Sequence, residues 1–125
     1  MIFDTDILIW YFRNNGNAVK LLSENAPFSI TAVTYMEIMQ GALNKQELIK
    51  LQKILKDSDT KILPITERIT YRAMNYVDNY ALSNSMELAD ALNAAICIEN
   101  DELFFTSNDK HYKCVPNLKI SVFRP

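Results

Sequence analysis

Three carboxylates, Asp4, Glu37 and Asp90, lie far apart in the sequence, among mostly apolar or small neighbours. A carboxylate in such surroundings needs a cation, a base or strong hydrogen-bond donors, because burying an unpaired charge is costly. A site built from carboxylates alone selects a hard cation with oxygen ligands, which favours Mg²⁺ or Mn²⁺ over zinc. Such ions bind phosphates and support in-line phosphoryl displacement. The residue types therefore favour phosphodiester hydrolysis by a metal-activated water.

Asp90 belongs to the most informative segment, residues 88–98, which is apolar on nearly every side. This pattern predicts a central, buried helix, with Asn93 on the same face as Asp90. No lysine or arginine occurs between Arg72 and Lys110, so the segment offers Asp90 no nearby ion pair. The alternative is a carboxylate bonded to backbone amides or to a distant arginine. We predict Asp90 as a metal ligand.

Asp4 follows the apolar residues 1–3 and is separated from Asp6 only by Thr5. Asp6 suits the N-cap of a helix that begins at residue 7, which leaves Asp4 for the metal. Glu37 lies in the middle of a predicted helix among small or polar neighbours, which leave room for a ligand. Its alternative role is a capping box with Thr34.

Two further polar positions are predicted to be structural. Glu87 follows Asn84 by three residues, which predicts a helix cap with Asn84 as the N-cap. His111 is the only histidine, and a single histidine is more often a surface or packing residue than a ligand.

The elements that must position these residues alternate between short apolar strands and helices. This alternation predicts a three-layer α/β/α sandwich with a central, mostly parallel sheet of about five strands. All 125 residues are expected to form a single domain. Ligands bind beyond the carboxyl ends of the strands in such folds, where Asp4 and residues 107–109 are expected. The predicted strands are 1–3, 27–30, 61–65, 103–106 and 118–123, and the predicted helices are 7–12, 18–23, 31–43, 46–56, 67–80 and 87–100.

Composition excludes several other classes. With only Gly16 and Gly41, the chain has no glycine-rich phosphate loop. No apolar run is long enough to cross a bilayer, and no signal peptide is evident. Two widely separated cysteines favour a reducing, cytoplasmic setting. The net charge of −2 argues mildly against nucleic-acid binding, but this argument weakens if a cation neutralises several carboxylates.

Four segments, 1–9, 29–41, 88–95 and 106–112, resemble in order the motifs of the PIN domain family. Within that family, the sequence looks like the VapC-type ribonuclease toxins. The resemblance covers essentially the whole chain. It implies Mg²⁺ or Mn²⁺ at Asp4, Glu37 and Asp90, and endonucleolytic cleavage of RNA. It also implies a homodimer and a cognate antitoxin that blocks the site.

The last of these motifs departs from the common form of the family. The usual acid five residues after Thr106 is replaced by His111, while Asn108 matches the family's asparagine. Asp109 is the nearest carboxylate and is predicted as the fourth metal contact, with Asn108 as the alternative. The side chains expected to support the ligands are Thr5, Asp6, Asn93, Thr106 and Asn108.

Two other functions compete with a nuclease. A receiver domain needs an aspartate at the end of its third strand, but residues 63–66 read Leu-Pro-Ile-Thr. The second alternative is a PIN-like binding module with an impaired metal site, and it is favoured because His111 replaces the family's acid. An RNA substrate would be bound mainly through its phosphates. The candidate phosphate contacts are Lys45, Lys50, Lys53, Arg68, Arg72 and Lys110. For each of them, a role as part of a solvated basic surface is an equal alternative.

Overall fold

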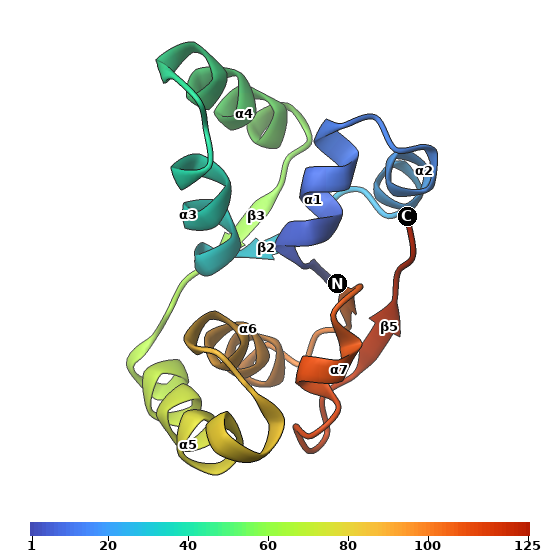
Figure 1. The fold of residues 1–125 in the computed structure, drawn as a ribbon. Helices are drawn as coiled ribbons and strands as arrows, with labels where there is room; N and C mark the ends of the chain where they lie inside the picture. Colours follow the sequence, from blue (N-terminus) through green and yellow to red (C-terminus); the bar gives the residue numbers. More distant parts are fainter.

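A five-stranded parallel sheet, in the order β3-β2-β1-β4-β5, forms the centre of the computed structural model, which describes residues 1–125 (Figure 1). This confirms the predicted sheet. The strands are β1 (Ile2–Phe3), β2 (Ser29–Thr31), β3 (Lys61–Leu63), β4 (Phe104–Thr106) and β5 (Ile120–Val122). The helices are α1 (Thr5–Phe12), α2 (Gly16–Glu24), α3 (Ala32–Gln40), α4 (Lys45–Asp57), α5 (Glu67–Asn84), α6 (Leu88–Glu99) and α7 (Asp109–Tyr112).

The helices cover the sheet on both faces, as the three-layer prediction requires (Figure 1). Successive strand residues point to opposite faces. Ile2 and Phe104 pack into the core under α5, α6 and α7, whereas Phe3 and Ile30 pack into the core under α1 to α4. The apolar segment 91–97 of α6 is buried, apart from the half-buried Leu92. Both faces of β1 are therefore buried in the core, and Asp4 follows at the end of this buried strand.

Asp4, Thr31 and Thr66 are the N-caps of the helices that follow β1, β2 and β3. The prediction that Asp6 caps the first helix is wrong, because α1 begins at Thr5 and places Asp6 inside its first turn. Strand β1 has β2 on one side and β4 on the other. The chain runs from β1 to β2 and β3 on one side, and then crosses back to β4 and β5 on the other side. Ligands bind at such a switch point in open parallel sheets.

The chain between α5 and α6 differs from the prediction. Helix α5 continues to Asn84, and Ser85 ends it in a left-handed conformation with φ of 54°. Asn84 therefore is not the N-cap of α6; Glu87 takes that position. The short helix α7 was not predicted, because one turn is too short to show a helical period.

Candidate metal centre

Asp4 lies at the carboxyl end of β1, and only 7% of its surface is exposed. The hydroxyl of Thr106, at the end of β4, donates a 2.7 Å hydrogen bond to Oδ2 of Asp4. The backbone N–H of Thr5 donates to Oδ1 at 2.8 Å. The N–H of Asn108 in turn donates to the Thr106 hydroxyl oxygen at 2.9 Å. Thr106 therefore contacts Asp4 directly, and Asn108 contacts it through Thr106.

The surroundings of Asp4 disfavour the ionised form of its carboxyl group. Burial raises its pKa from 3.8 to about 7, and the charges of Asp6 and, more weakly, Asp90 raise it further, while the bonds from Thr106 and Thr5 lower it. No lysine, arginine or histidine forms a salt bridge with Asp4. The fold therefore gathers negative charge around a buried acid without a balancing side chain.

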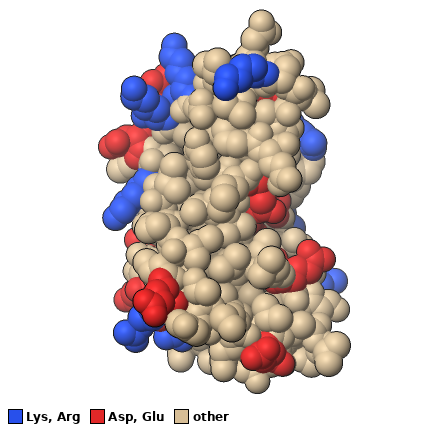
Figure 2. Space-filling model, turned by 90° about the vertical axis from the view of Figure 1, so that its left-hand side faces the viewer, with Lys and Arg blue, Asp and Glu red and all other residues tan.

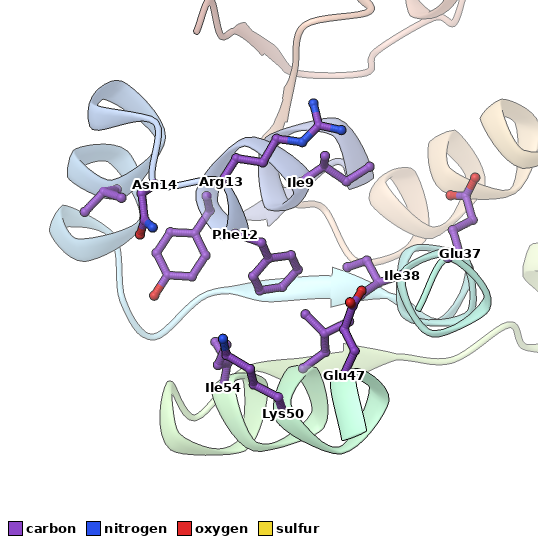
Figure 3. A pocket seen from close by; sticks show the side chains of 13 residues that line it. Ile9, Phe12, Arg13, Asn14, Glu37, Ile38, Glu47, Lys50 and Ile54 are labelled. Carbon is purple, nitrogen blue, oxygen red and sulfur yellow. The ribbon is translucent and has the colours of Figure 1, made fainter. Parts of the chain in front are cut away.

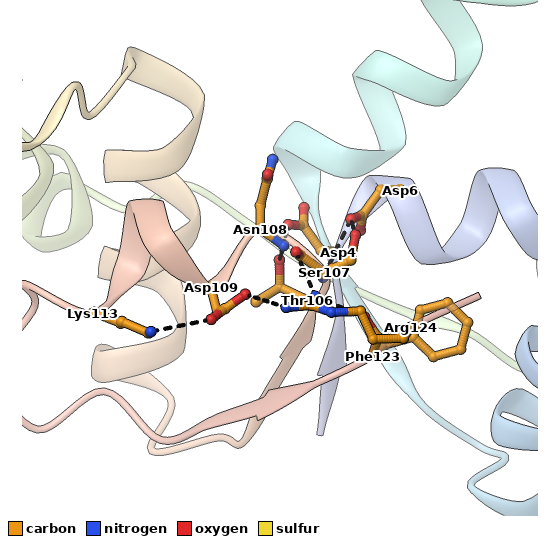
Figure 4. A network of polar contacts seen from close by, with 9 residues as sticks. All are labelled: Asp4, Asp6, Thr106, Ser107, Asn108, Asp109, Lys113, Phe123 and Arg124. Atoms are coloured by element: carbon orange, nitrogen blue, oxygen red, sulfur yellow. Dashed lines mark hydrogen bonds and ion pairs between the residues drawn. The ribbon is translucent and has the colours of Figure 1, made fainter.

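Asp6 links α1 to the loop that follows β4 (Figure 4). Its Oδ2 accepts a hydrogen bond from the N–H of Ser107 at 3.3 Å and contacts the Ser107 hydroxyl. Its Oδ1 accepts from the N–H of Ile7 at 2.8 Å. Asp6 thus holds the loop between β4 and α7 beside Asp4.

Asp90 is half-buried at the third position of α6 and has three hydrogen-bonding neighbours. Its Oδ1 accepts from the Tyr112 hydroxyl at 3.2 Å. Its Oδ2 accepts from the Glu87 N–H at 3.1 Å and lies 3.1 Å from His111 Nδ1. The bond from the Glu87 N–H agrees with the alternative of backbone partners, whereas the two side-chain partners come from α7, which was not predicted.

Asn93 shares the face of Asp90, as the helical spacing predicted, and is buried behind it. The Thr31 hydroxyl donates to its Oδ1 at 2.7 Å. Its Nδ2 lies 3.5 Å from the Tyr112 hydroxyl oxygen. Asn93 therefore connects the end of β2 to the side chain that bonds Asp90.

Glu37 is exposed in the middle of α3. The alternative of a Thr34–Glu37 capping box is wrong, because Thr31 is the N-cap and its hydroxyl accepts from the Thr34 N–H at 3.0 Å. Glu37 Oε1 instead accepts a 2.8 Å hydrogen bond from the Thr5 hydroxyl. Thr5 joins Glu37 to the helix that begins at Asp4.

Asp109 is buried at the start of α7, but cations already hold its carboxylate (Figure 4). Its oxygens lie 3.0 Å from Arg124 and 3.4 Å from Lys113. The Arg124 guanidinium lowers the pKa of Asp109. Arg124 also donates to the backbone oxygen of Ser107 at 2.8 Å. Sequence reasoning missed Arg124, because it lies close to Asp109 only in the folded chain.

The predicted ligands do not converge on one point. No group of three or more His, Cys, Asp or Glu side chains has the geometry of a complete metal site. The structure brings Asp4 and Asp90 close enough to repel each other and connects Glu37 to them through Thr5. It directs Asp109 toward Arg124.

A cavity of about 700 Å³ lies beside Glu37, between α1, α3 and α4 (Figure 3). Apolar side chains of all three helices form much of its wall, among them Ile9, Phe12, Ile38 and Ile54. Arg13, Glu37, Glu47 and Lys50 contribute the charged groups.

The predicted basic contacts fall into separate groups. Arg68 and Arg72 of α5 both pair with Glu99 of α6, at 3.0 and 2.7 Å, so they serve helix packing. Lys45, Lys50 and Lys53 are exposed along α4. Figure 2 shows lysine and arginine gathered toward the upper end of this face, which is the end where α4 lies in Figure 1. Lys110 is exposed on α7.

The fold and the acidic strand ends together define an α/β domain with a carboxylate site at its switch point. Residues 1–118 match the model of the PIN domain, and the chain belongs to that family. The family resemblance predicted from the four motifs is thereby confirmed. Among curated proteins, none matches the sequence significantly.

Similar solved structures come from toxin–antitoxin complexes. A chain of the toxin–antitoxin complex from Klebsiella pneumoniae is 26% identical, with a TM-score of 0.79 and coverage of 99% of this chain and 96% of that one. VapBC2 from Rickettsia felis, bound to a promoter DNA fragment, shows 20% identity, a TM-score of 0.79 and coverage of 99% and 100%. VapBC-1 from nontypeable Haemophilus influenzae shows 20% identity, a TM-score of 0.79 and coverage of 98% of each chain. None of the helices in this structure has the length and apolarity to cross a membrane.

Proposed function

We propose that this chain is a Mg²⁺- or Mn²⁺-dependent endoribonuclease and the toxin of a toxin–antitoxin pair. The observation that supports this most is the buried carboxyl of Asp4, whose pKa of about 7 reflects burial and the nearby charges of Asp6 and Asp90. A divalent cation would offset that repulsion. The donor set consists of carboxylate oxygens, which fits a hard cation.

Asp4, Asp90 and Glu37 are the residues that would hold the ion. Mg²⁺ usually binds through one or two carboxylates and keeps several waters, so an incomplete protein cage is compatible with it. When bound, such an ion supplies an activated water and stabilises the charge that develops on the phosphate. Thr106 and the N–H of Thr5 orient Asp4, and the Thr5 hydroxyl orients Glu37. Exposed Glu37 lies where a long phosphodiester chain can approach.

We propose that the antitoxin binds in the cavity between α1, α3 and α4. Its apolar wall with charged groups suits an amphipathic helix, whose apolar face would cover Ile9, Phe12 and Ile54. A helix bound there would also cover Glu37, which lines the same cavity. Inhibition would follow from blocking RNA access. The homodimer implied by the resemblance stays a prediction.

The test is cleavage of single-stranded RNA by the purified protein with Mn²⁺. We expect EDTA to abolish cleavage and Mn²⁺ to restore it. Asp4→Asn and Asp90→Asn should abolish cleavage while circular dichroism shows a folded protein. Asp78→Asn is the matched control, because Asp78 is exposed on α5 and forms no salt bridge. Cleavage by Asp90→Asn at the wild-type rate would contradict the proposal.

A catalytically impaired binding module is the second candidate. It is favoured by His111 in place of the family's acid and by the absence of three convergent metal-binding side chains. Under this alternative, wild-type protein would cut no RNA with Mn²⁺ but would still bind an antitoxin in the α1–α3–α4 cavity.

A further inference from the structure

Helix α7 supplies two neighbouring side chains to the same carboxylate, that of Asp90. The Tyr112 hydroxyl donates to Oδ1 at 3.2 Å, and His111 Nδ1 lies 3.1 Å from Oδ2. These two oxygens therefore have different partners from consecutive residues of one helical turn. The family's usual acid is absent at position 111, so α7 supplies donors to a carboxylate where another carboxylate is expected.

We propose that His111 and Tyr112 are positioning residues that hold the Asp90 carboxylate in a fixed orientation toward the metal, and that they act in place of a fourth acidic ligand. This inference rests on the proposed function, because it assigns a task to residues beside a metal ligand. Partners of metal ligands of this kind fix the orientation of the ligand and tune its affinity for the ion.

The hydrogen-bonding capacity of Asp90 shows which atom remains open. A carboxylate has about four acceptor sites, two on each oxygen. The Glu87 N–H and His111 occupy both sites of Oδ2. Tyr112 occupies one site of Oδ1. One site on Oδ1 is left for a cation, so Asp90 would bind through a single oxygen.

The donors also form a directed chain. The Thr31 hydroxyl donates to Asn93, the Asn93 amide donates to the Tyr112 oxygen, and the Tyr112 hydroxyl donates to Asp90. Hydrogen bonds aligned in this way polarise one another in a buried environment. Tyr112 is only 1% exposed. Its burial, with the charges of Asp4 and Asp90, raises the pKa of the Tyr112 hydroxyl, so the proton stays available for donation.

A carboxylate accepts and does not donate, so the bond to Asp90 requires the proton of His111 on Nδ1. Because His111 is the only histidine, the ¹⁵N spectrum of the imidazole reports this tautomer without overlap. In metal-free protein above neutral pH, we expect a proton on Nδ1 in the wild type and its loss from that nitrogen in Asp90→Ala. An unchanged tautomer in Asp90→Ala would overturn the His111 contact, whatever the protein's activity.

Mn²⁺ binding to the whole chain tests the effect on the metal, measured by electron paramagnetic resonance of the free ion. We expect Tyr112→Phe and His111→Ala each to weaken Mn²⁺ binding about 10-fold or more. His111→Gln keeps a side-chain N–H donor and should bind more tightly than His111→Ala. Tyr80→Phe is the matched control, because the partly buried Tyr80 packs against the same core cluster as Tyr112. It should bind Mn²⁺ as the wild type does.

The outcomes separate the two levels of the proposal. If Asp90→Asn loses Mn²⁺ binding while Tyr112→Phe and His111→Ala bind as tightly as the wild type, the positioning role is overturned and the proposed function stands. An equal loss in Tyr80→Phe and Tyr112→Phe would assign the effect to core packing and would also overturn it. If Asp90→Asn binds Mn²⁺ like the wild type, Asp90 is not a ligand and the proposed metal site itself fails.

Discussion

The hydroxyl of Thr5 lies 2.8 Å from Glu37 Oε1 and 2.9 Å from the hydroxyl of Thr34, and so connects the first turn of α1 to α3. Glu37 is exposed and has no salt bridge, so this hydroxyl is the side chain that restrains it. The N–H of the same residue bonds Asp4. Thr5 therefore fixes the orientation of two proposed ligands relative to each other.

Thr5→Val removes the hydroxyl and keeps the shape of the side chain. We expect Mn²⁺ affinity and RNA cleavage to fall about 10-fold, as is typical when a partner of a metal ligand is lost. Thr5→Ser restores the hydroxyl and should recover most of the affinity. Wild-type Mn²⁺ binding by Thr5→Val, measured by titration calorimetry, would contradict this role.

The stability of the metal-free protein should depend on pH through Asp4. Its folded-state pKa of about 7 lies above the value of 3.8 expected in the unfolded chain. The folded state therefore binds the proton more tightly, and this stabilisation is complete below the unfolded pKa and lost as pH rises through the folded pKa. In EDTA, the free energy of unfolding should fall from about pH 4 to just above pH 7, between the unfolded and folded pKa values of Asp4, with an upper limit near 1.4 kcal/mol per pKa unit.

Asp4→Asn provides the control for this pH dependence, because the amide is similar in shape and does not titrate. Denaturant titrations at each pH should show a flatter profile for Asp4→Asn than for the wild type. Equal slopes in the two proteins would place the titrating group elsewhere.

Asp109 and Arg124 are expected to act as one unit that holds the loop between β4 and α7. Because the carboxylate pairs with Arg124 and Lys113, Asp109→Asn should reduce cleavage far less than Asp90→Asn does. Arg124→Gln should have a similar effect, and the double variant should be no worse than either single one. Arg124 is exposed, so the loss of stability should be small. If Asp109→Asn is inactive while Arg124→Gln is unaffected, Asp109 is the fourth ligand after all.

The exposed lysines of α4 should contribute to RNA binding through phosphate contacts. We expect Lys50→Ala and Lys53→Ala to weaken binding of single-stranded RNA, and each to lower the slope of log affinity against log salt by about 0.7. Arg68→Ala is the matched control, because Arg68 pairs with Glu99 on α6. Affinities are measured by fluorescence anisotropy. An equal change of slope in Arg68→Ala would show that the phosphate contacts are not specific to the lysines of α4.

If the antitoxin binds in the α1–α3–α4 cavity, a charge introduced into its apolar wall should weaken that binding. Ile9→Glu should weaken binding of the proposed antitoxin partner by about 10-fold or more, since burying an isoleucine contributes about 1.5–3 kcal/mol. Ile62→Glu is the matched control: Ile62 is 43% exposed against 39% for Ile9, and it does not line the cavity. Loss of binding in both variants would point to a general effect on folding.

The sequence by itself determined the fold class, because short apolar strands and amphipathic helices alternate along the whole chain. It also singled out Asp4 and Asp90 as candidate ligands, since charged groups in otherwise apolar segments stand out in the sequence. Thr106 and Asn108 were predicted as supporting residues from the motif that resembles the family, and Asn93 from its helical spacing to Asp90; all three lie in the hydrogen-bond networks around Asp4 and Asp90.

Only the tertiary structure decided which donors reach which carboxylate. Tyr112 and His111 lie 22 and 21 residues from Asp90, and Arg124 lies 15 residues from Asp109. No local period links such positions, because the contacts depend on how α6, α7 and β5 pack around the end of the sheet. Asp109 and Asp90 look alike as sequence, but the fold places Asp109 beside Arg124 and Asp90 beside Tyr112, His111 and a backbone N–H. That difference in partners is the physical reason why Asp90, and not Asp109, is the acid that we assign most firmly to the metal.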